Sequence, residues 1–236
     1  MTSRAEILGV KVDCLTMKQA VEKVDALIKN KTPSLVATAN AEMLMLANSD
    51  VELQKILNSA AMVTADGAGT VWAARHLGYD MPERVAGVDL VTNLIVKGYK
   101  IYFFGAAAGV ADLAAENVKK KYNANIAGTR NGFFSADDEA QIISDINNSG
   151  AEILLVGLGV PKQEKWIFNN LDKLKVPVCI GVGGSLDVLA GKVKRAPRWM
   201  QRAKLEWLFR AILQPSRAGR LLALPKFVYN VVKSKN

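Results

Sequence analysis

Several polar side chains follow short apolar runs of the chain, at the positions where predicted strands end. Thr38 and Asn40 follow one such run and can hydrogen-bond a sugar or a base, although residues of these types also cap helices. Asp66 follows a second run and precedes Gly67, which lets a ligand approach the backbone closely. A carboxylate in this position suits a general base, and the alternative interpretation is again a helix cap.

Glycine residues gather at three further predicted strand ends, where small residues allow phosphate oxygens to approach backbone N–H groups. None of the three segments has the spacing of a dinucleotide-binding fingerprint or a Walker loop. Taken together they favour a ligand that contains phosphate. The residues concerned, with two polar neighbours that would face the same crevice, are Gly105, Gly157, Gly159, Lys162, Gln163, Gly183 and Gly184.

A phosphate-containing ligand needs positive charge, and Arg84 is the candidate in the loop over residues 82–89. Its guanidinium could clamp a diphosphate, or it could pair with a nearby acid, Glu83 or Asp89. A metal ion is the usual alternative source of charge. The single histidine, His76, excludes the usual zinc sites, and no Asp-x-Asp pair is present, so we expect neither a metal nor another cofactor.

The elements that must position these residues alternate between strands and helices. The strands are apolar throughout, which is typical of a parallel sheet covered on both faces. This pattern predicts a doubly wound, mostly parallel, Rossmann-like α/β fold, in which ligands bind beyond the carboxyl ends of the strands. The predicted strands are 34–38, 62–65, 100–104, 125–129, 152–157 and 177–182, and the predicted helices are 17–29, 51–60, 88–96, 110–121, 136–148 and 163–171.

The charge of the chain changes sharply after residue 191. Residues 192–236 hold twelve lysines and arginines and a single acid, Glu206, whereas residues 1–191 hold nineteen bases and twenty-one acids. We therefore predict an α/β domain at 1–191, which would hold the phosphate-containing ligand, and a basic helical C-terminal appendage at 192–236 that would meet an anionic partner. Arginines interleaved with apolar residues favour contact with an anionic membrane surface over simple packing on the domain.

Composition excludes several other classes of protein. The two cysteines, Cys14 and Cys179, cannot build a disulfide framework, so a reducing compartment is expected. The longest stretches without a charge have only eleven residues, well short of a membrane span. We therefore expect a cytoplasmic protein that binds the membrane peripherally, and its apolar appendage helix could also drive self-association.

Six blocks of sequence, in order over nearly the whole chain, resemble the WecG/TagA/CpsF glycosyltransferase family: residues 38–42, 65–67, 82–89, 157–164, 195–199 and 205–210. The resemblance is greatest to TagA-type members, which are N-acetylmannosaminyltransferases of wall teichoic acid synthesis. It implies a UDP-N-acetylmannosamine (UDP-ManNAc) donor, an undecaprenyl-diphosphate-linked N-acetylglucosamine acceptor and a β-1,4 linkage formed without a metal at the inner leaflet of the membrane.

The resemblance also implies roles for particular residues. Asp66 would be the base, and its companions in the active site would be Thr38, Asn40, Arg84 and Gln163. The appendage would meet the membrane, where Arg210, Arg217 and Arg220 would reach the diphosphates. An inverting transfer needs one such base, and arginines would stabilise the departing UDP.

Three alternatives remain open from the sequence. A related transferase could use UDP-glucose or a mannosaminuronic acid donor. A nucleic-acid-binding protein could use the basic tail, but no groove-reading motif is present and the glycine-rich strand ends would be unexplained, so we expect no nucleic-acid partner. A nicotinamide-dependent oxidoreductase would lack its fingerprint.

Overall fold

Six parallel strands form the central sheet of the protein, which we analysed as a computed structural model. The structure describes all residues except 1–2, 198, 201–205, 207, 210–222 and 236. The strand order β4-β3-β8-β7-β5-β6 confirms the doubly wound α/β prediction. The strands are β3 (Ser34–Ala39), β4 (Met62–Ala65), β5 (Ile101–Gly105), β6 (Ile126–Arg130), β7 (Ile153–Gly157) and β8 (Val178–Gly181).

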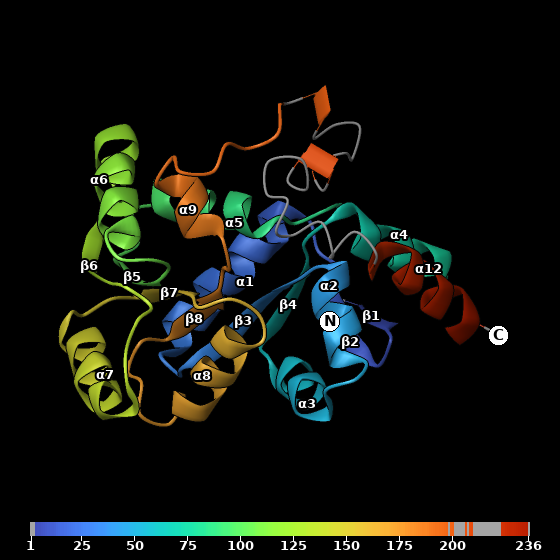
Figure 1. The fold of residues 1–236 in the computed structure, drawn as a ribbon, viewed down its shortest axis with the longest axis horizontal. Helices are drawn as coiled ribbons and strands as arrows, with labels where there is room; N and C mark the ends of the chain where they lie inside the picture. Colours follow the sequence, from blue (N-terminus) through green and yellow to red (C-terminus); the bar gives the residue numbers. More distant parts are fainter. Residues whose placement is uncertain (1–2, 198, 201–205, 207, 210–222, 236) are drawn as a thin grey trace.

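Helices cover both faces of this sheet, as Figure 1 shows. Two hydrophobic clusters, one on each face, bury the side chains of the apolar strands. One face carries α1 (Met17–Asn30), α5 (Gly87–Val96), α6 (Val110–Tyr122) and α9 (Ser185–Leu189). The other carries α2 (Ala41–Ala47), α3 (Val51–Ser59), α7 (Glu139–Asn148) and α8 (Lys162–Asn170).

Local sequence signals explain several of the helix boundaries. Thr16 begins α1 with a capping box closed by Gln19, and Asp50 caps α3 by accepting from the Leu53 N–H. The helix predicted over 136–148 begins instead with a 3₁₀ turn, Ala136–Asp138, before α7. The pattern-based prediction therefore placed these elements correctly to within a few residues.

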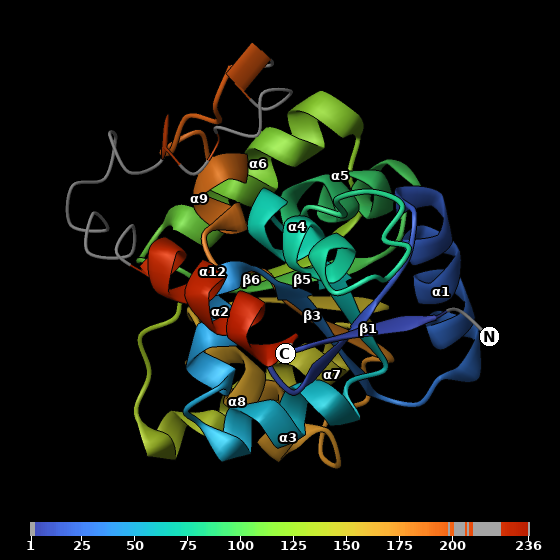
Figure 2. The ribbon, with the colours of Figure 1, turned by 90° about the vertical axis from the view of Figure 1, so that its right-hand side faces the viewer.

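The β4 edge of the sheet is covered by elements that the strand pattern did not predict. A hairpin of β1 (Arg4–Ile7) and β2 (Val10–Asp13) packs beside β4. Next to it lie α4 (Ala68–His76) and the C-terminal α12 (Ala223–Ser234), which Figures 1 and 2 both place side by side. Among the described residues, no helix is long and apolar enough to cross a bilayer.

Helix α12 is anchored to the α/β body by its inner face. Phe227 and Val231 are 1% and 0% exposed and belong to the hydrophobic core. The helix contacts α2 and α4, and Lys235 Nζ donates to the carbonyl oxygen of His76 at 2.7 Å. Part of the basic C-terminal segment is therefore packed on the domain that precedes it.

Asp13 joins the hairpin to the edge strand. Its carboxylate is 1% exposed, and its Oδ2 accepts from the Val63 N–H of β4 at 2.8 Å. Its Oδ1 pairs with Arg4 Nε at 3.1 Å and with Lys23 Nζ at 2.9 Å. One buried anion thus satisfies a backbone donor of the sheet edge and neutralises two cations.

Glu164, in the first turn of α8, is a second buried carboxylate but a poorly satisfied one. It is 0% exposed, and its Oε1 accepts from Gln163 Nε2 at 2.7 Å. Its Oε2 is buried without a hydrogen-bond partner. Burial raises the pKa of Glu164 from 4.5 to about 7, because the charged form is poorly solvated there.

We expect the Asp13→Ala variant to be strongly destabilised. The change leaves Arg4, Lys23 and the Val63 N–H without their shared acceptor, which should lower the free energy of unfolding by about 3–5 kcal/mol. Urea unfolding monitored by circular dichroism measures this loss. The matched control is Glu22→Ala, which removes the exposed Lys18–Glu22 pair and should cost less than about 0.5 kcal/mol. Equal small losses in both variants would contradict the role given to Asp13.

The raised pKa of Glu164 predicts a pH-dependent stability. The pKa of Glu164 is higher in the folded state than in the unfolded state, so the folded protein is favoured while Glu164 is protonated. This contribution to the free energy of unfolding is complete below pH 4.5 and is lost as the pH rises through about 7. Glu164→Gln, which stays neutral, should abolish up to roughly 3 kcal/mol of this loss between about pH 5 and about pH 8. Chemical unfolding at several pH values measures it, with Glu116→Gln, an exposed carboxylate of α6, as the control. Parallel pH profiles of wild type and Glu164→Gln would contradict the prediction.

Candidate active site

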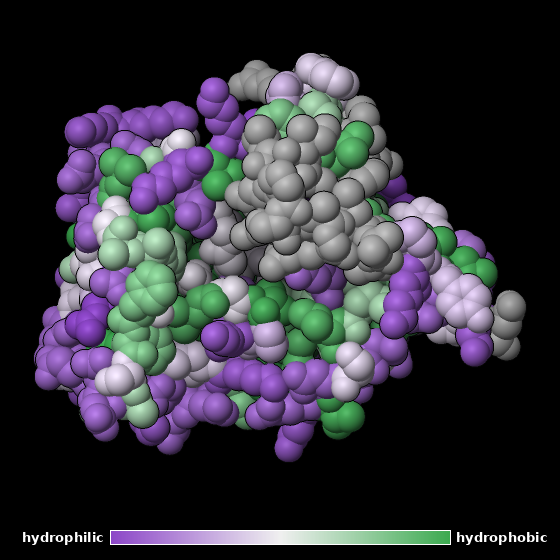
Figure 3. Space-filling view, in the orientation of Figure 1, coloured by the Kyte–Doolittle hydropathy of each residue, from purple (hydrophilic) through white to green (hydrophobic). Residues whose placement is uncertain are grey.

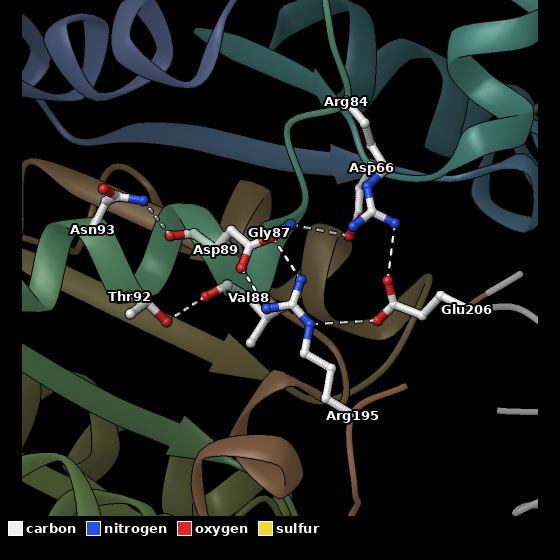
Figure 4. Close-up of polar contacts among 9 residues, drawn as sticks. All are labelled: Asp66, Arg84, Gly87, Val88, Asp89, Thr92, Asn93, Arg195 and Glu206. Carbon is white, nitrogen blue, oxygen red and sulfur yellow. Dashed lines mark hydrogen bonds and ion pairs between the residues drawn. The ribbon is translucent and has the colours of Figure 1, made fainter. Parts of the chain in front are cut away.

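Asp66 lies directly after β4, and the loop over residues 82–87 holds it there. Its backbone N–H donates to the Ala39 carbonyl at 2.9 Å, and its Oδ2 accepts from the Gly87 N–H at 3.2 Å. The Val85 N–H donates to the Ala65 carbonyl at 3.0 Å, so this loop runs beside the end of the strand. Figure 4 shows the carboxylate of Asp66 with its Gly87 contact. Asp66 is therefore a partly buried acid at a strand end.

The interpretation of Asp66 as a helix cap is wrong. The N-cap of α4 is Gly67, and this helix has no side-chain cap hydrogen bond. Gly67 adopts φ 124°, a conformation that favours glycine, and the turn it makes separates Asp66 from the helix. The carboxylate of Asp66 is thus oriented by a loop rather than used to begin α4.

Thr38 and Asn40 lie beside Asp66, because β3 is the neighbour of β4. Thr38 is 7% exposed, and a Cβ built on Gly87 would come within 3.1 Å of its Oγ1. Asn40 is adjacent to Gly67 and caps α2, accepting from the Met43 N–H at 2.9 Å. The cap interpretation of Asn40 is therefore correct, and the residue also belongs to the cluster around Asp66.

Gln163 reaches the same cluster from the other side, through β8. It is 1% exposed, its Nε2 donates to Glu164, and its Oε1 accepts from the Gly183 N–H at 2.9 Å. Thr38 Oγ1 donates to the Gly181 carbonyl at 3.0 Å, and a Cβ on Gly181 would lie 2.8 Å from Gln163 Nε2. Gln163 therefore fixes the turn after β8 while it approaches the strand that Thr38 contacts.

The predicted glycine cluster forms a second part of the site. Gly105 and Gly157 are paired at the ends of β5 and β7, and a Cβ on Gly105 would lie 2.5 Å from the Gly157 carbonyl carbon. A Cβ on Gly157 would lie 3.0 Å from the Gly183 carbonyl oxygen. These glycines thus permit close approach of three backbone segments to one another. Gly157 and Gly105 lie three and four strand spacings from Asp66, roughly 15–20 Å, whereas Gly183 follows β8, two spacings away, and bonds Gln163 of the Asp66 cluster, so the two groups of residues adjoin.

The other predicted phosphate-binding positions border this second part. Gly159 has φ 80° and no atom within 4 Å of a Cβ built on it, and Lys162 is exposed at the start of α8. Gly184 is the N-cap of α9. Phosphate binding at these residues stays a prediction.

Arg84 pairs with a residue distant in sequence. The sequence analysis offered Glu83 or Asp89 as its partner, but its Nη1 donates to Glu206 Oε2 at 2.9 Å. Glu83 instead accepts from the backbone of Met17, and Asp89 pairs with Arg195. Figure 4 shows this chain of charges beside Asp66. The expectation of a local ion pair was wrong because the C-terminal segment supplies the nearer carboxylate.

Three further arginines of the prediction, Arg210, Arg217 and Arg220, lie outside the described residues. Within the part of the chain that the structure describes, no three His, Cys, Asp or Glu side chains gather in a way that could hold a metal ion. Two guanidinium groups, those of Arg84 and Arg195, lie near Asp66, and both are paired with carboxylates.

Sequence reasoning missed four residues of this region: Gly87, Glu164, Arg195 and Glu206. Glu206 carried one signal, because it is the single acid among twelve bases in residues 192–236. Glu164 ended a recognised block, 157–164, but an acid in the first turn of a helix is common and nothing in the sequence indicated that it would be buried. Gly87 and Arg195 lay within recognised blocks, but only their contacts reveal what they do.

Known proteins resemble this chain over nearly its whole length, including all the site residues described above. Residues 5–236 match the glycosyl transferase WecG/TagA/CpsF family. The N-acetylglucosaminyldiphosphoundecaprenol N-acetyl-beta-D-mannosaminyltransferase of Staphylococcus aureus strain NCTC 8325 / PS 47 is 32% identical over 240 residues, 99% of this chain and 94% of the relative. Proteins of the same name from strains COL and N315 match equally well. The chain therefore belongs to the WecG/TagA/CpsF family and is a glycosyltransferase.

Proposed function

We propose that the protein transfers N-acetylmannosamine from UDP-ManNAc to N-acetylglucosamine linked to undecaprenyl diphosphate, forming a β-1,4 linkage in wall teichoic acid linkage-unit synthesis. The observation that carries this proposal is the 32% identity, over 99% of the chain, to enzymes whose printed name gives this sugar and this acceptor. The same name favours mannosamine over glucose or mannosaminuronic acid as the transferred sugar.

Asp66 is the general base of the proposed reaction. Its carboxylate takes the proton from the acceptor 4-hydroxyl while the oxygen attacks the anomeric carbon and the bond to UDP breaks. Attack opposite the leaving group inverts the anomeric configuration. The Gly87 N–H holds one carboxylate oxygen at 3.2 Å and so orients the carboxylate of Asp66.

The departing UDP takes the bonding electron pair and gains negative charge. Arg84 lies in the loop after α4, which runs beside the end of β4, and is the arginine best situated among the described residues to stabilise that charge. Arg210, Arg217 and Arg220 would add to it from the C-terminal segment. We propose that these guanidiniums take the place that a divalent metal occupies in other nucleotide-sugar transferases.

The acceptor is lipid-linked, so the proposed reaction takes place at the cytoplasmic face of the membrane. The outer face of α12 suits this contact: Val228, Tyr229 and Val232 are 42%, 64% and 42% exposed. Lys226 and Lys233 are exposed on the same helix. Figure 3 shows hydrophobic and hydrophilic side chains close together on α12, at the right of the view. Such a mixture favours an anionic bilayer surface.

We expect Asp66→Asn to lose nearly all transferase activity while it keeps the fold. The amide cannot accept the hydroxyl proton, and loss of a general base lowers kcat by about 10²–10⁴. Mass spectrometry of the product formed from UDP-ManNAc and the lipid-linked acceptor, in the presence of a chelator, measures this loss. An Asp66→Asn variant as active as the wild type would remove Asp66 from the mechanism.

The same assay tests metal independence. If the chelator abolishes the activity of the wild-type enzyme, metal independence is contradicted. If UDP-glucose gives product and UDP-ManNAc does not, UDP-ManNAc is not the donor.

Membrane binding should depend on the lysines of α12. Each lysine near an anionic leaflet contributes about 1 kcal/mol, so the double variant Lys226→Gln/Lys233→Gln should bind anionic vesicles about 30-fold more weakly. Vesicle sedimentation at two salt concentrations measures this. The matched control removes two exposed lysines from α6, as Lys119→Gln/Lys120→Gln. Equal losses in the two double variants would argue against α12 as the membrane-facing surface.

A further inference from the structure

Glu206 is an unusual residue in its surroundings. It is the single acid in residues 192–236, yet it is only 7% exposed. A glutamate is rarely buried to this extent unless it is paired. Both of its oxygens face guanidinium groups: Oε2 lies 2.9 Å from Arg84 Nη1, and Oε1 lies 3.7 Å from Arg195 Nε.

The pair belongs to a chain of four alternating charges, Asp89–Arg195–Glu206–Arg84, drawn in Figure 4. Arg195 binds Asp89 through both terminal nitrogens, with Nη2 2.6 Å from Oδ2. Asp89 lies in the first turn of α5, where the helix dipole favours an acid. This row of charges therefore begins at α5 and ends at Arg84. The guanidinium of Arg84 is thus held by a residue of the C-terminal segment, Glu206.

Arg84 is connected just as closely to Asp66. The next residue, Val85, donates to the carbonyl of Ala65, the residue before Asp66. Gly87, two residues further on, donates to the Asp66 carboxylate. A guanidinium has five N–H groups, so a pair through one terminal nitrogen leaves donors that can bind a second anion. Glu206 can therefore orient Arg84 without using up its capacity to bind phosphate.

We propose that Glu206 is a positioning residue of the transferase: it fixes the Arg84 guanidinium in the orientation that binds the donor diphosphate. This inference rests on the proposed function, because it assumes a diphosphate donor at Arg84. The same contact makes the placement of Glu206 beside Arg84 a condition for a competent donor site. The C-terminal segment thus has a role in donor binding that is distinct from contact with lipid.

The test compares wild type, Glu206→Gln, Arg84→Gln and the double variant, all as full-length chains. Glutamine keeps the shape of the side chain and removes its charge, so Arg84 loses a charge-assisted bond and becomes free to change rotamer. We expect Glu206→Gln to weaken UDP binding, measured by isothermal titration calorimetry, by about tenfold. The KM for UDP-ManNAc should rise by a similar factor, while the KM for the acceptor should stay near the wild-type value.

The double-mutant cycle separates positioning from general stabilisation. If Glu206 acts through Arg84, Glu206→Gln should weaken UDP binding less than about twofold further in the Arg84→Gln background. The control is Glu52→Gln, which removes the carboxylate of another ion pair, 2.6 Å from Lys165 Nζ, on α3. It should leave UDP affinity unchanged. Thermal unfolding of each variant identifies any loss that comes from the fold.

Unchanged or tighter UDP binding by Glu206→Gln would overturn the inference, and tighter binding would indicate that Glu206 competes with the diphosphate. An equal loss in both backgrounds would overturn it as well, because Glu206 would then not act through Arg84. These results leave the proposed function intact if wild type binds UDP and forms product. Failure of wild type to bind UDP would instead reject the proposed function, and the inference with it.

Discussion

The hydrogen bonding of β4 determines where the carboxylate of Asp66 lies. This strand has one neighbour in the sheet, β3, so its other edge presents backbone groups that need partners. Asp13 accepts from Val63, and Arg4 donates to the Ala61 carbonyl, so the hairpin supplies those partners from the side. Asp66 follows β4 directly, and its position is only as well defined as that of the strand. The buried ion cluster at Asp13 therefore supports the active site from below, although it contacts no residue of it.

Close backbone approach is the second constraint on the site. A Cβ on Gly87 would crowd Thr38, and a Cβ on Gly181 would lie 2.7 Å from Glu164 Oε1. These glycines bring a loop and a strand end against side chains that would otherwise be held apart. The arrangement buries Glu164 beside Gln163 with one oxygen unsatisfied. The buried carboxyl group of Glu164 thus lies next to Gln163, and titratable groups with shifted pKa values often lie near functional sites. Its effect on the free energy of unfolding depends on pH, because only the charged form is destabilised by burial.

The sequence predicted what depends on local pattern and missed what depends on contacts distant along the chain. Apolar runs such as 153–156 identify buried parallel strands. The strand-end rule singled out Thr38, Asn40 and Asp66, the family resemblance added Gln163, and the structure places these four residues close together. The hairpin over residues 4–13 was missed because its strands, RAEI and VKVD, mix charged and apolar residues and so lack the continuous apolar runs that marked the buried strands. The Arg84–Glu206 pair joins residues 122 positions apart, and no periodicity links them. The charge pattern of residues 192–236 indicated only that Glu206 is the single acid among twelve bases.

The position of α12 connects the site to the surface where the acceptor must arrive. This helix packs on α2 and α4, and these two helices begin directly after Asn40 and after Asp66 and Gly67. Phe227 lies on the inner face of α12, and a Cβ on Gly69 of α4 would be 3.7 Å from its ring. The outer face of the same helix exposes Tyr229 and lysines. Helix α12 therefore lies between an outer surface that carries lysines and apolar side chains and the first turns of α2 and α4, the helices that follow Asn40 and Asp66. If the acceptor meets the protein at that surface, as we propose, α12 and the first turns of α2 and α4 are the elements between the lipid diphosphate and Asp66.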